Sequence, residues 1–442
     1  MIPVPKDNGI SKGYLRPADG IVPFGTGPGV DRGGVNWNGS CYRVMGTKLV
    51  RVESSGSVTT LADVGGSGQC SFDYSFDRLG IASSGNLYYW DGSTLTQVTD
   101  SDLGVVTDFI WVDGYFMTTD GTSLVVTELN APTSVNPLKY GSAEADPDSI
   151  MAILKLRNEP YAVGRYTVEV FQNVGGDYFP FSRISGAQMM RGSIGVHTAC
   201  VYQENLVFMG GGRNEQTAIW VGSNGSTAKI STREIDQILL SFTETQLADS
   251  LMEVRVTNGH NLLYIHLPDR TLVYDGAASN ELSEPVWFIL HSGITAPSIY
   301  RARNFVWCYG EWLCGDPTTS NIGYLTSELS SHFGDVVSWE FGTTITYNQG
   351  AGIVFHEIEL VCLTGRAQFG EDPTIWTSYS SDGLSWSMER PRTAGKFGER
   401  TKRISWLQQG FARHWRIQKF RGTSDCHIAV ARLEARIEGM AY

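Results

Sequence analysis

Short apolar runs that end at Asp-Gly or Asn-Gly dipeptides recur through most of this chain and limit the folds open to it. The clearest group has runs at 109–112, 115–118 and 124–126, separated by Asp113-Gly114 and Asp120-Gly121. Dipeptides of this kind supply the positive φ angles that tight hairpin turns need. Each such group therefore predicts a meander of antiparallel strands.

Related runs at 87–90, 218–221 and 272–274 also precede Asp-Gly or Asn-Gly dipeptides. Successive meanders are typical of β-propellers, in which radial repetition leaves few free sheet edges. The 50 glycines and the 11% aromatic content agree with a turn-rich all-β protein. The sequence predicts an all-β fold with a propeller of six or seven blades. The alternative, a pair of β-sandwiches, would need fewer meanders and longer cross-connections.

A short helical insertion is expected at 231–250. Ser231 and Glu234 match the capping-box pattern, and apolar residues then recur at helical spacing. Thr243 and Gln246 match the same pattern for a second short helix. Strands at 262–267 and 271–274 should follow, paired across a turn. The apolar face of the first helix consists of Ile235, Ile238, Leu239 and Phe242.

Three domains are predicted along the chain. Residues 1–36 are rich in Gly and Pro and are interpreted as an extended N-terminal arm, with a disordered or locally packed terminus as the alternative. Residues 37–340 should form the propeller with its helical insertion. From 341 to 442 longer alternating strands predict a β-sandwich-like domain. In its last strand, Ala429, Leu433 and Ile437 should point one way while Arg432 and Glu438 point the other.

The charge distribution is uneven. Residues 390–421 hold ten basic residues against one acid, Glu399, a net charge of +9, so the remaining 410 residues sum to −21 because the whole chain carries −12. A cationic segment in the C-terminal domain could contact an acidic partner or DNA phosphates. The alternative is a solvated strand face whose cations pair with acids from elsewhere.

Motifs for catalysis, cofactors and metals do not match this sequence. The histidines lack zinc-protease spacing, and Cys308 and Cys314 fit no zinc pattern. The segment 380–386 is similar to an Asp-box hairpin but is one residue short, and it is interpreted as a turn beneath which Trp386 packs. The sequence therefore predicts no catalytic residue, no cofactor and no metal.

Targeting signals are also missing from the sequence. No run reaches transmembrane length and no signal peptide is apparent. The seven cysteines are odd in number and mostly isolated, which argues against a disulfide framework. We therefore expect a chain that has no membrane segment and that stays in the cytoplasm where it is made.

Several blocks of text, in order, resemble one family: the packaged-DNA stabilization protein, or tail hub, family of short-tailed bacteriophages (podoviruses). The strongest blocks are ISTREIDQILLSFTETQLADSLMEV (230–254) and GHNLLYIHLPDRTLVYDG (259–276). Further blocks lie at 29–52, 164–173, 179–195 and 429–438. The resemblance covers nearly the whole chain.

The resemblance implies a non-enzymatic virion protein: a cyclic ring, with six copies as the family expectation, that extends and seals the DNA channel and stabilises packaged DNA. Its implied partners are further copies of the chain, the adapter or head-to-tail connector above, a tail needle or plug below, fibre or spike proteins at the periphery, and double-stranded DNA without sequence specificity. The implied place is the virion tail, assembled in the host bacterial cytoplasm. Candidate partner-interface residues are Arg413, Arg416, Trp406 and Trp415.

Two other functions are compatible with the composition and the predicted propeller. One is a glycan-binding or glycan-cleaving propeller on the virion, which would release reducing ends from host polysaccharide. The other is a generic intracellular propeller that serves as an interaction platform. The second explains the composition but not the ordered family blocks.

Overall fold

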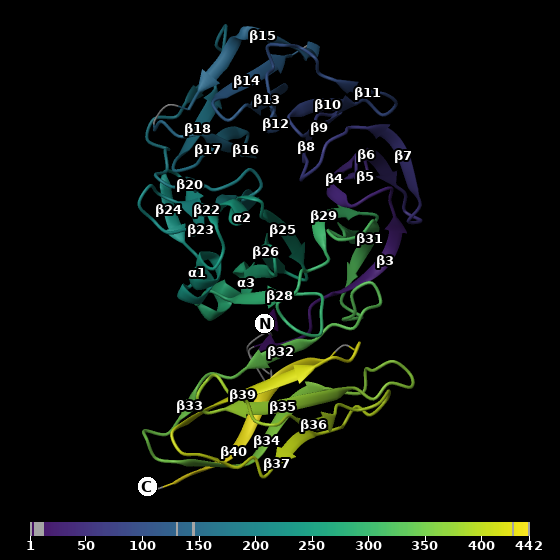
Figure 1. Ribbon diagram of the computed structural model, residues 1–442, viewed down its shortest axis with the longest axis vertical. Coiled ribbons are helices and arrows are strands. Elements are labelled where there is room, and N and C mark those ends of the chain that lie inside the picture. Colours follow the sequence, from purple (N-terminus) through teal and green to yellow (C-terminus); the bar gives the residue numbers. More distant parts are fainter. Residues whose placement is uncertain (1, 4–12, 130, 144–145, 427, 441–442) are drawn as a thin grey trace. The chain divides into compact units, whose positions relative to one another are not determined.

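A computed structural model of the chain describes residues 2–3, 13–129, 131–143, 146–426 and 428–440. The described residues form two compact units (Figure 1). One consists of Phe24–Leu290 and Ile299–Tyr324, and we call it the propeller unit. The other takes in His291–Ser298, Leu325–Tyr442 and the N-terminal residues up to Pro23, and we call it the sandwich unit.

Seven blades follow one another around the propeller unit in the described residues, each a sheet of four or five antiparallel strands (Figure 1). The first four blades are β4–β7 (Asp31–Trp37, Ser40–Met45, Lys48–Val52, Val58–Asp63), β8–β11 (Ser71–Tyr74, Leu79–Ser83, Asn86–Trp90, Leu95–Gln97), β12–β15 (Asp108–Val112, Tyr115–Thr119, Ser123–Glu128, Ala131–Ser142) and β16–β19 (Ile150–Leu156, Glu159–Gly164, Val168–Asn173, Phe181–Arg183). The next two are β20–β24 (Gly192–Ser193, Ala199–Tyr202, Asn205–Gly211, Ala218–Ser223, Ser226–Lys229) and β25–β28 (Leu251–Thr257, His260–His266, Thr271–Asp275, Trp287–Leu290). The all-β propeller prediction is therefore confirmed, with seven blades.

The seventh blade is completed by a strand from the start of the chain. Its first three strands are β29 (Arg303–Cys308), β30 (Glu311–Gly315) and β31 (Asn321–Thr326), and the outermost is β3 (Gly20–Thr26). The backbone N–H of Gly27 donates to the carbonyl of Ser320 over 2.9 Å. This pairing joins the two ends of the propeller segment and closes the ring of blades.

Cores between neighbouring blades hold the ring together. In one of them Ile110, Val112 and Met117 of the third blade pack with Ile153 and Phe171 of the fourth, and all five are at most 5% exposed. Such strands are apolar on both faces because each blade is covered by the blades on either side. The continuous apolar runs in the sequence are a consequence of that double burial.

The described residues of the propeller unit form three helices: α1 (Arg233–Leu240), α2 (Glu244–Ala248) and α3 (Gly276–Leu282). The capping box of Thr243 and Gln246 is confirmed. The box predicted for Ser231 and Glu234 is wrong, because Thr232 is the N-cap and Ser231 Oγ instead donates to Asp236 Oδ1 over 2.7 Å. The third helix is absent from the prediction, which placed only a turn at Asp275-Gly276. No helix in the described part of the chain is long and apolar enough to cross a membrane.

Two sheets make the body of the sandwich unit. One contains β32 (Trp339–Gly342), β33 (Thr346–Tyr347), β35 (Thr374–Ser380), β36 (Arg390–Thr393) and β39 (Trp415–Gly422). The other contains β34 (Ile353–Leu363), β37 (Ile404–Leu407), β38 (Phe411–Ala412) and β40 (Ala429–Gly439). A short pair, β1 (Ile2–Pro3) and β2 (Gly13–Tyr14), adds a third small sheet. The predicted sandwich is confirmed, with residues of both large sheets in one core.

Part of the segment predicted as an extended arm is strand. β3 and the first six residues of β4 fall within 1–36, while residues 4–12 lie outside the described residues. The glycines that suggested a loop serve a close packing instead, because a Cβ at Gly33, where φ is +139°, would lie 2.7 Å from the ring of Phe72. The predicted boundaries at 36/37 and 340/341 stay predictions.

The alternation predicted for the last strand holds only over its first half. Ala429 is buried and Leu433 packs against the core, whereas Ala435 and Ile437 are exposed. β40 is paired with β34 along its length, with Leu360 opposite Leu433. From Glu434 to Gly439 every residue of β40 is exposed.

Candidate functional site

The innermost strands of all seven blades surround an axial cavity of about 380 Å³. Its lining mixes apolar side chains with ionisable ones, and the ionisable members are Asp73, Asp108, Lys155, His197 and Glu253. Every second side chain of each innermost strand faces the axis, because side chains alternate along a strand. Polar side chains on different blades are therefore brought together here.

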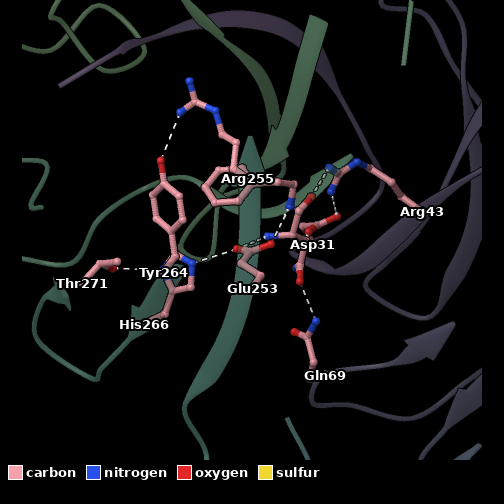
Figure 2. Close-up of polar contacts among 10 residues, drawn as sticks. Asp31, Arg43, Gln69, Glu253, Arg255, Tyr264, His266 and Thr271 are labelled. Atoms are coloured by element: carbon pink, nitrogen blue, oxygen red, sulfur yellow. Dashed lines mark hydrogen bonds and ion pairs between the residues drawn. The ribbon is translucent and has the colours of Figure 1, made fainter. Parts of the chain in front are cut away.

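A buried ion pair lies beside this cavity. Arg43 Nη1 donates to Asp31 Oδ1 over 2.7 Å, and the side chains are 0% and 1% exposed (Figure 2). Burial raises the pKa of Asp31 even though Arg43 opposes the shift. Both side chains come from the first blade, on β4 and β5. The close packing requires Gly315 of the seventh blade, because a Cβ there would lie 2.2 Å from Asp31 Cγ.

Asn304 connects this ion pair to three other blades. Its Nδ2 donates to Asp31 Oδ2 over 2.6 Å, and its carbonyl accepts from Arg43 Nη2 over 2.7 Å. Its Oδ1 accepts from Gln69 Nε2 over 2.5 Å, and its backbone N–H donates to Glu253 Oε1 over 2.9 Å. Asn304 has φ of +57° at a bulge in β29, a conformation that Asn tolerates better than most residues.

Glu253 continues the network into the sixth blade. Its Oε2 accepts from the backbone N–H of Phe305 over 2.7 Å, and its Oε1 lies 2.7 Å from His266 Nε2 (Figure 2). His266 is fully buried between the rings of Tyr264 and Tyr300, and burial lowers its pKa although Glu253 opposes the shift. Thr271 Oγ1 holds the other ring nitrogen at 2.9 Å.

Two more axial carboxylates bind the backbone of the next blade. Asp73 Oδ2 accepts from the N–H of Trp111 over 2.6 Å, and Asp108 Oδ2 accepts from that of Ile153 over 2.9 Å. Burial raises the pKa of Asp108 to about 6. Together with Glu253, these carboxylates clamp the second blade to the third, the third to the fourth and the sixth to the seventh. We call this set of contacts the axial network.

The hydrogen bonds of the axial network mainly stabilise the arrangement of the blades. Its carboxylates accept hydrogen bonds from backbone N–H groups, which fixes neighbouring blades relative to one another. Burial lowers the pKa of His197 at the cavity to about 4, so this imidazole is neutral at neutral pH. In the part of the chain that the structure describes, no group of three His, Cys, Asp or Glu residues is placed to hold a metal ion. Sequence reading missed the axial network; its only signal was charge within apolar strands, as in Leu-Met-Glu-Val-Arg-Val (251–256).

Two of the four predicted interface residues are buried. Trp406 is 0% exposed in the core of the sandwich unit, where its Nε1 donates to the carbonyl of Arg390 over 2.9 Å. Arg416 is 1% exposed, with its guanidinium 3.9 Å from the ring centroid of Tyr379 and 4.4 Å from that of Phe355. Side chains buried to this degree offer no surface that a partner could contact directly.

Arg413 is exposed and Trp415 is half-buried, so both remain accessible candidates. Four of the ten basic residues at 390–421 pair with a carboxylate in the described residues, among them Lys396 with Asp372. Arg403 pairs with Glu359, Arg421 with Glu389, and Lys419 with Glu340. The interpretation of this segment as a strand face balanced by acids from elsewhere therefore fits four of its ten cations.

The segment at 380–386 forms the turn that the sequence predicts. Asp382 Oδ1 accepts from the backbone N–H groups of Leu384 and Ser385, both over 2.8 Å. These bonds and one from the Ser385 hydroxyl lower the pKa of Asp382. Trp386 is 39% exposed and lies under Lys419, whose Nζ is 4.3 Å from the ring centroid.

Comparison with known proteins gives matches to both units. Residues 1–330 match the family model described as "Bacteriophage P22 Gp10, beta-propeller", and residues 338–438 match "Bacteriophage P22 Gp10, beta-sandwich". A curated relative is the tail hub protein gp10 of Salmonella phage P22, 27% identical over 459 aligned residues that cover 99% of this chain and 94% of the relative.

Solved structures give weaker matches. PorZ of Porphyromonas gingivalis is similar over 73% of this chain and 38% of its own, at 14% identity and a TM-score of 0.41. The Neurospora crassa Pan2 WD40 domain is similar over 71% of this chain and 97% of its own, at 9% identity and a TM-score of 0.43.

Proposed function

The chain belongs to the bacteriophage P22 Gp10 family, and from that membership we propose that it is the tail hub protein of a short-tailed phage. The observation that carries the proposal is the match through both units in chain order, together with 27% identity over 99% of the chain. Its work is structural: it forms a ring below the portal and adapter that extends and seals the DNA channel. It is not an enzyme.

The ring should consist of several copies, with six as the family expectation. The axial cavity of one propeller, about 380 Å³ and lined by side chains, has no room for duplex DNA, whose major groove alone is about 12 Å wide. The DNA conduit would therefore lie between copies around a cyclic axis.

The charge of the propeller unit supports a role beside DNA that must move. The unit has 31 acidic and 18 basic residues, a net charge of −13, whereas the sandwich unit has a net charge of +1. A wall of like charge does not bind phosphates tightly, so packaged DNA can slide past it during ejection. DNA contact would then be without sequence specificity.

We place this ring in the virion tail after assembly in the host cytoplasm. The adapter or head-to-tail connector lies above it, a needle or plug below it, and fibres or spikes at its periphery. Arg413 and Trp415 stay candidates for one of these contacts because their side chains are accessible.

An early stop codon in the gene of the parent virus tests the proposal. Particles made without the chain should package DNA and then lose it, with tails that end at the adapter, and supplying the intact chain in trans should restore both. The measurements are electron microscopy of the particles and quantification of DNA retained in them. Stable, DNA-filled particles that lack only host attachment would refute the hub function and favour the glycan-directed alternative.

A further inference from the structure

The last strand of the sandwich unit, β40, lies at an edge of its sheet. One side of β40 pairs with β34 along its length. On the other side, Val430 exchanges two backbone hydrogen bonds with Leu15, of 2.7 and 2.8 Å. Between Leu433 and Gly439 no strand of the described residues pairs with that side. A long edge of this kind can add a strand from another chain.

The backbone groups at this edge belong to every second residue of β40. The N–H of Met440 points toward β34, because it donates to the carbonyl of Gly352 over 2.7 Å. Backbone groups alternate in direction along a strand, so those of Leu433, Ala435 and Ile437 point away from β34. Residue 431 is a bulge that shifts the alternation, which agrees with the outward bonds of residue 430.

These outward groups define a register in which β40 can pair with itself. An antiparallel pair with Ala435 opposite Ala435 of a second copy also places Leu433 opposite Ile437 of that copy. Each of these residues points its N–H and C=O outward, so opposite residues can exchange both hydrogen bonds. The register therefore satisfies the backbone groups on the open side of the strand.

The charged side chains of β40 are complementary in the same register. Arg432 would face Glu438 of the second copy, and Glu434 would face Arg436. All four side chains are exposed, and within one copy Arg432 also pairs with Glu434 over 2.6 Å. Opposite charges across antiparallel strands stabilise the pairing, and like charges destabilise it. Every charge of the row thus meets its opposite.

Neighbouring two-fold registers match fewer charges. With the axis at Leu433, Arg436 would face Val430, whose outward groups are already bonded to Leu15. With the axis at Ile437, Glu434 would face the apolar side chain of Met440. The charge pattern therefore favours the register that is centred on Ala435.

The apolar row of β40 supports the same register. Leu433 packs against the core of the sandwich unit, whereas Ile437 is 51% exposed. In the pair, Ile437 of one copy lies beside Leu433 of the other on the same face of the joined sheet. The exposed end of one row would then continue the packed end of the other, which removes apolar surface from water.

We propose that β40 pairs with β40 of a second copy about a two-fold axis at Ala435, so that one continuous sheet joins two sandwich units. A two-fold contact uses the same surface on both copies, so it joins two chains and then stops. It is therefore separate from the ring contact of the proposed hub, which needs two different surfaces on each chain. Pairing of free chains covers an edge that could otherwise add strands without control.

Sedimentation velocity of the full chain over a range of concentrations tests this contact. The wild-type chain should dimerise reversibly. Arg432→Glu/Arg436→Glu makes the charged row entirely acidic, and Glu434→Arg/Glu438→Arg makes it entirely basic. Each variant alone should dimerise about tenfold more weakly or worse, with circular dichroism to check folding. An equimolar mixture of the two should dimerise again, because each row then faces its opposite.

The matched control for net charge is Arg366→Glu/Lys396→Glu. Both side chains are exposed on loops of the same unit, away from the open side of β40. The control changes the charge of the chain as much as Arg432→Glu/Arg436→Glu does. It should dimerise like the wild-type chain.

A proline at the two-fold axis gives a second readout that does not depend on charge. Ala435→Pro removes an N–H that points outward and keeps the hydrogen bonds to β34, a position that proline tolerates in edge strands. It should weaken dimerisation by about tenfold or more and leave circular dichroism unchanged. Ala435→Ser keeps the N–H and should dimerise normally.

Two results would overturn the inference. One is a wild-type chain that forms no dimer at any concentration, or a dimer that survives both the charge reversals and Ala435→Pro. The other is a set of β40 variants that leave the free chain unchanged and block binding of a neighbouring tail protein, which would assign the edge to a strand of that protein. Neither result bears on the hub proposal, which the particles made without the chain test separately.

Discussion

Removal of one partner of the Arg43–Asp31 pair should destabilise the propeller strongly. In Arg43→Met the Asp31 carboxylate keeps Asn304 as a donor but loses its counterion, and the carbonyl of Asn304 loses the guanidinium that binds it. Breaking a buried ion pair in this way costs about 3–5 kcal/mol. The assay is urea unfolding of the full chain, followed by tryptophan fluorescence, with the propeller transition fitted separately from that of the sandwich.

The matched control is the exposed pair of the same blade, Lys48 and Asp63, whose side chains are 40% and 53% exposed. Lys48→Met should change stability by no more than about 1 kcal/mol. In the double variant Arg43→Met/Asp31→Leu no charge is left unpaired, so much of the loss should be recovered. The reasoning is refuted if Arg43→Met is no more destabilising than Lys48→Met, or if the double variant is worse than the single one.

The loss of stability caused by Arg43→Met should change with pH in a direction that the structure predicts. Burial already raises the pKa of Asp31 in the intact protein, and loss of Arg43 removes the main opposing influence. A carboxyl with a raised folded-state pKa contributes stability at low pH and loses it as pH rises. The stability lost through Arg43→Met should therefore be smaller at pH 5 than at pH 8.

Three further outcomes follow from burial, titration and capping. Trp406→Ala should cost about 3–5 kcal/mol in the unfolding of the sandwich unit, whereas Trp415→Ala should stay within about 1 kcal/mol, and equal losses in calorimetry would contradict the burial difference. Asp108 has a folded-state pKa of about 6 against 3.8 as its ordinary value, so its contribution is present below pH 4 and is lost as pH rises through 6. The stability of the intact chain relative to Asp108→Asn should thus fall by about 2 kcal/mol between pH 4 and pH 7 in urea titrations, and a constant difference would refute that pKa. Thr243→Ala should cost about 1 kcal/mol by loss of the α2 cap, seen as faster amide exchange in α2, while Ser241→Ala should leave α2 exchange unchanged.

Local signals in the sequence were sufficient to predict a propeller fold. The meander at 109–126 appears as β12, β13 and β14 because Asp-Gly turns and apolar runs act over a few residues. The helix α3 was missed for a local reason as well. Asp275 looks like a turn residue before Gly276, yet its Oδ1 accepts from the N–H of Ala278 and caps a helix.

The axial network could not be read from the sequence because its members meet only after the ring closes. Asp31 and Asn304 are 273 residues apart, and their contact depends on the register of two different blades. Neither residue has a neighbour in sequence that signals the pairing. Long-range contacts of this kind are decided by the whole fold.

The burial of Arg416 on β39 could not be predicted for a different reason. Trp415 and Ile417 suggest that odd-numbered positions point inward, but the buried row is Arg416, Gln418 and Phe420. Aromatic rings from β34 and β35 receive the Arg416 guanidinium, so the polar row is the one that the core accommodates. Strand alternation predicts that two faces differ and leaves open which of them is buried.

The pairing of β3 with β31 also determines when the propeller can be completed during synthesis of the chain. β3 leaves the ribosome before every other strand of the propeller, yet its partner β31 lies 295 residues later, counted from Thr26 to Asn321. At 5–20 residues per second the interval is about 15–60 s, during which the edge of β3 has no native partner. A nascent chain must therefore keep that edge from pairing with its neighbours on a polysome. Only chains synthesised through β31, to residue 326, can complete the propeller.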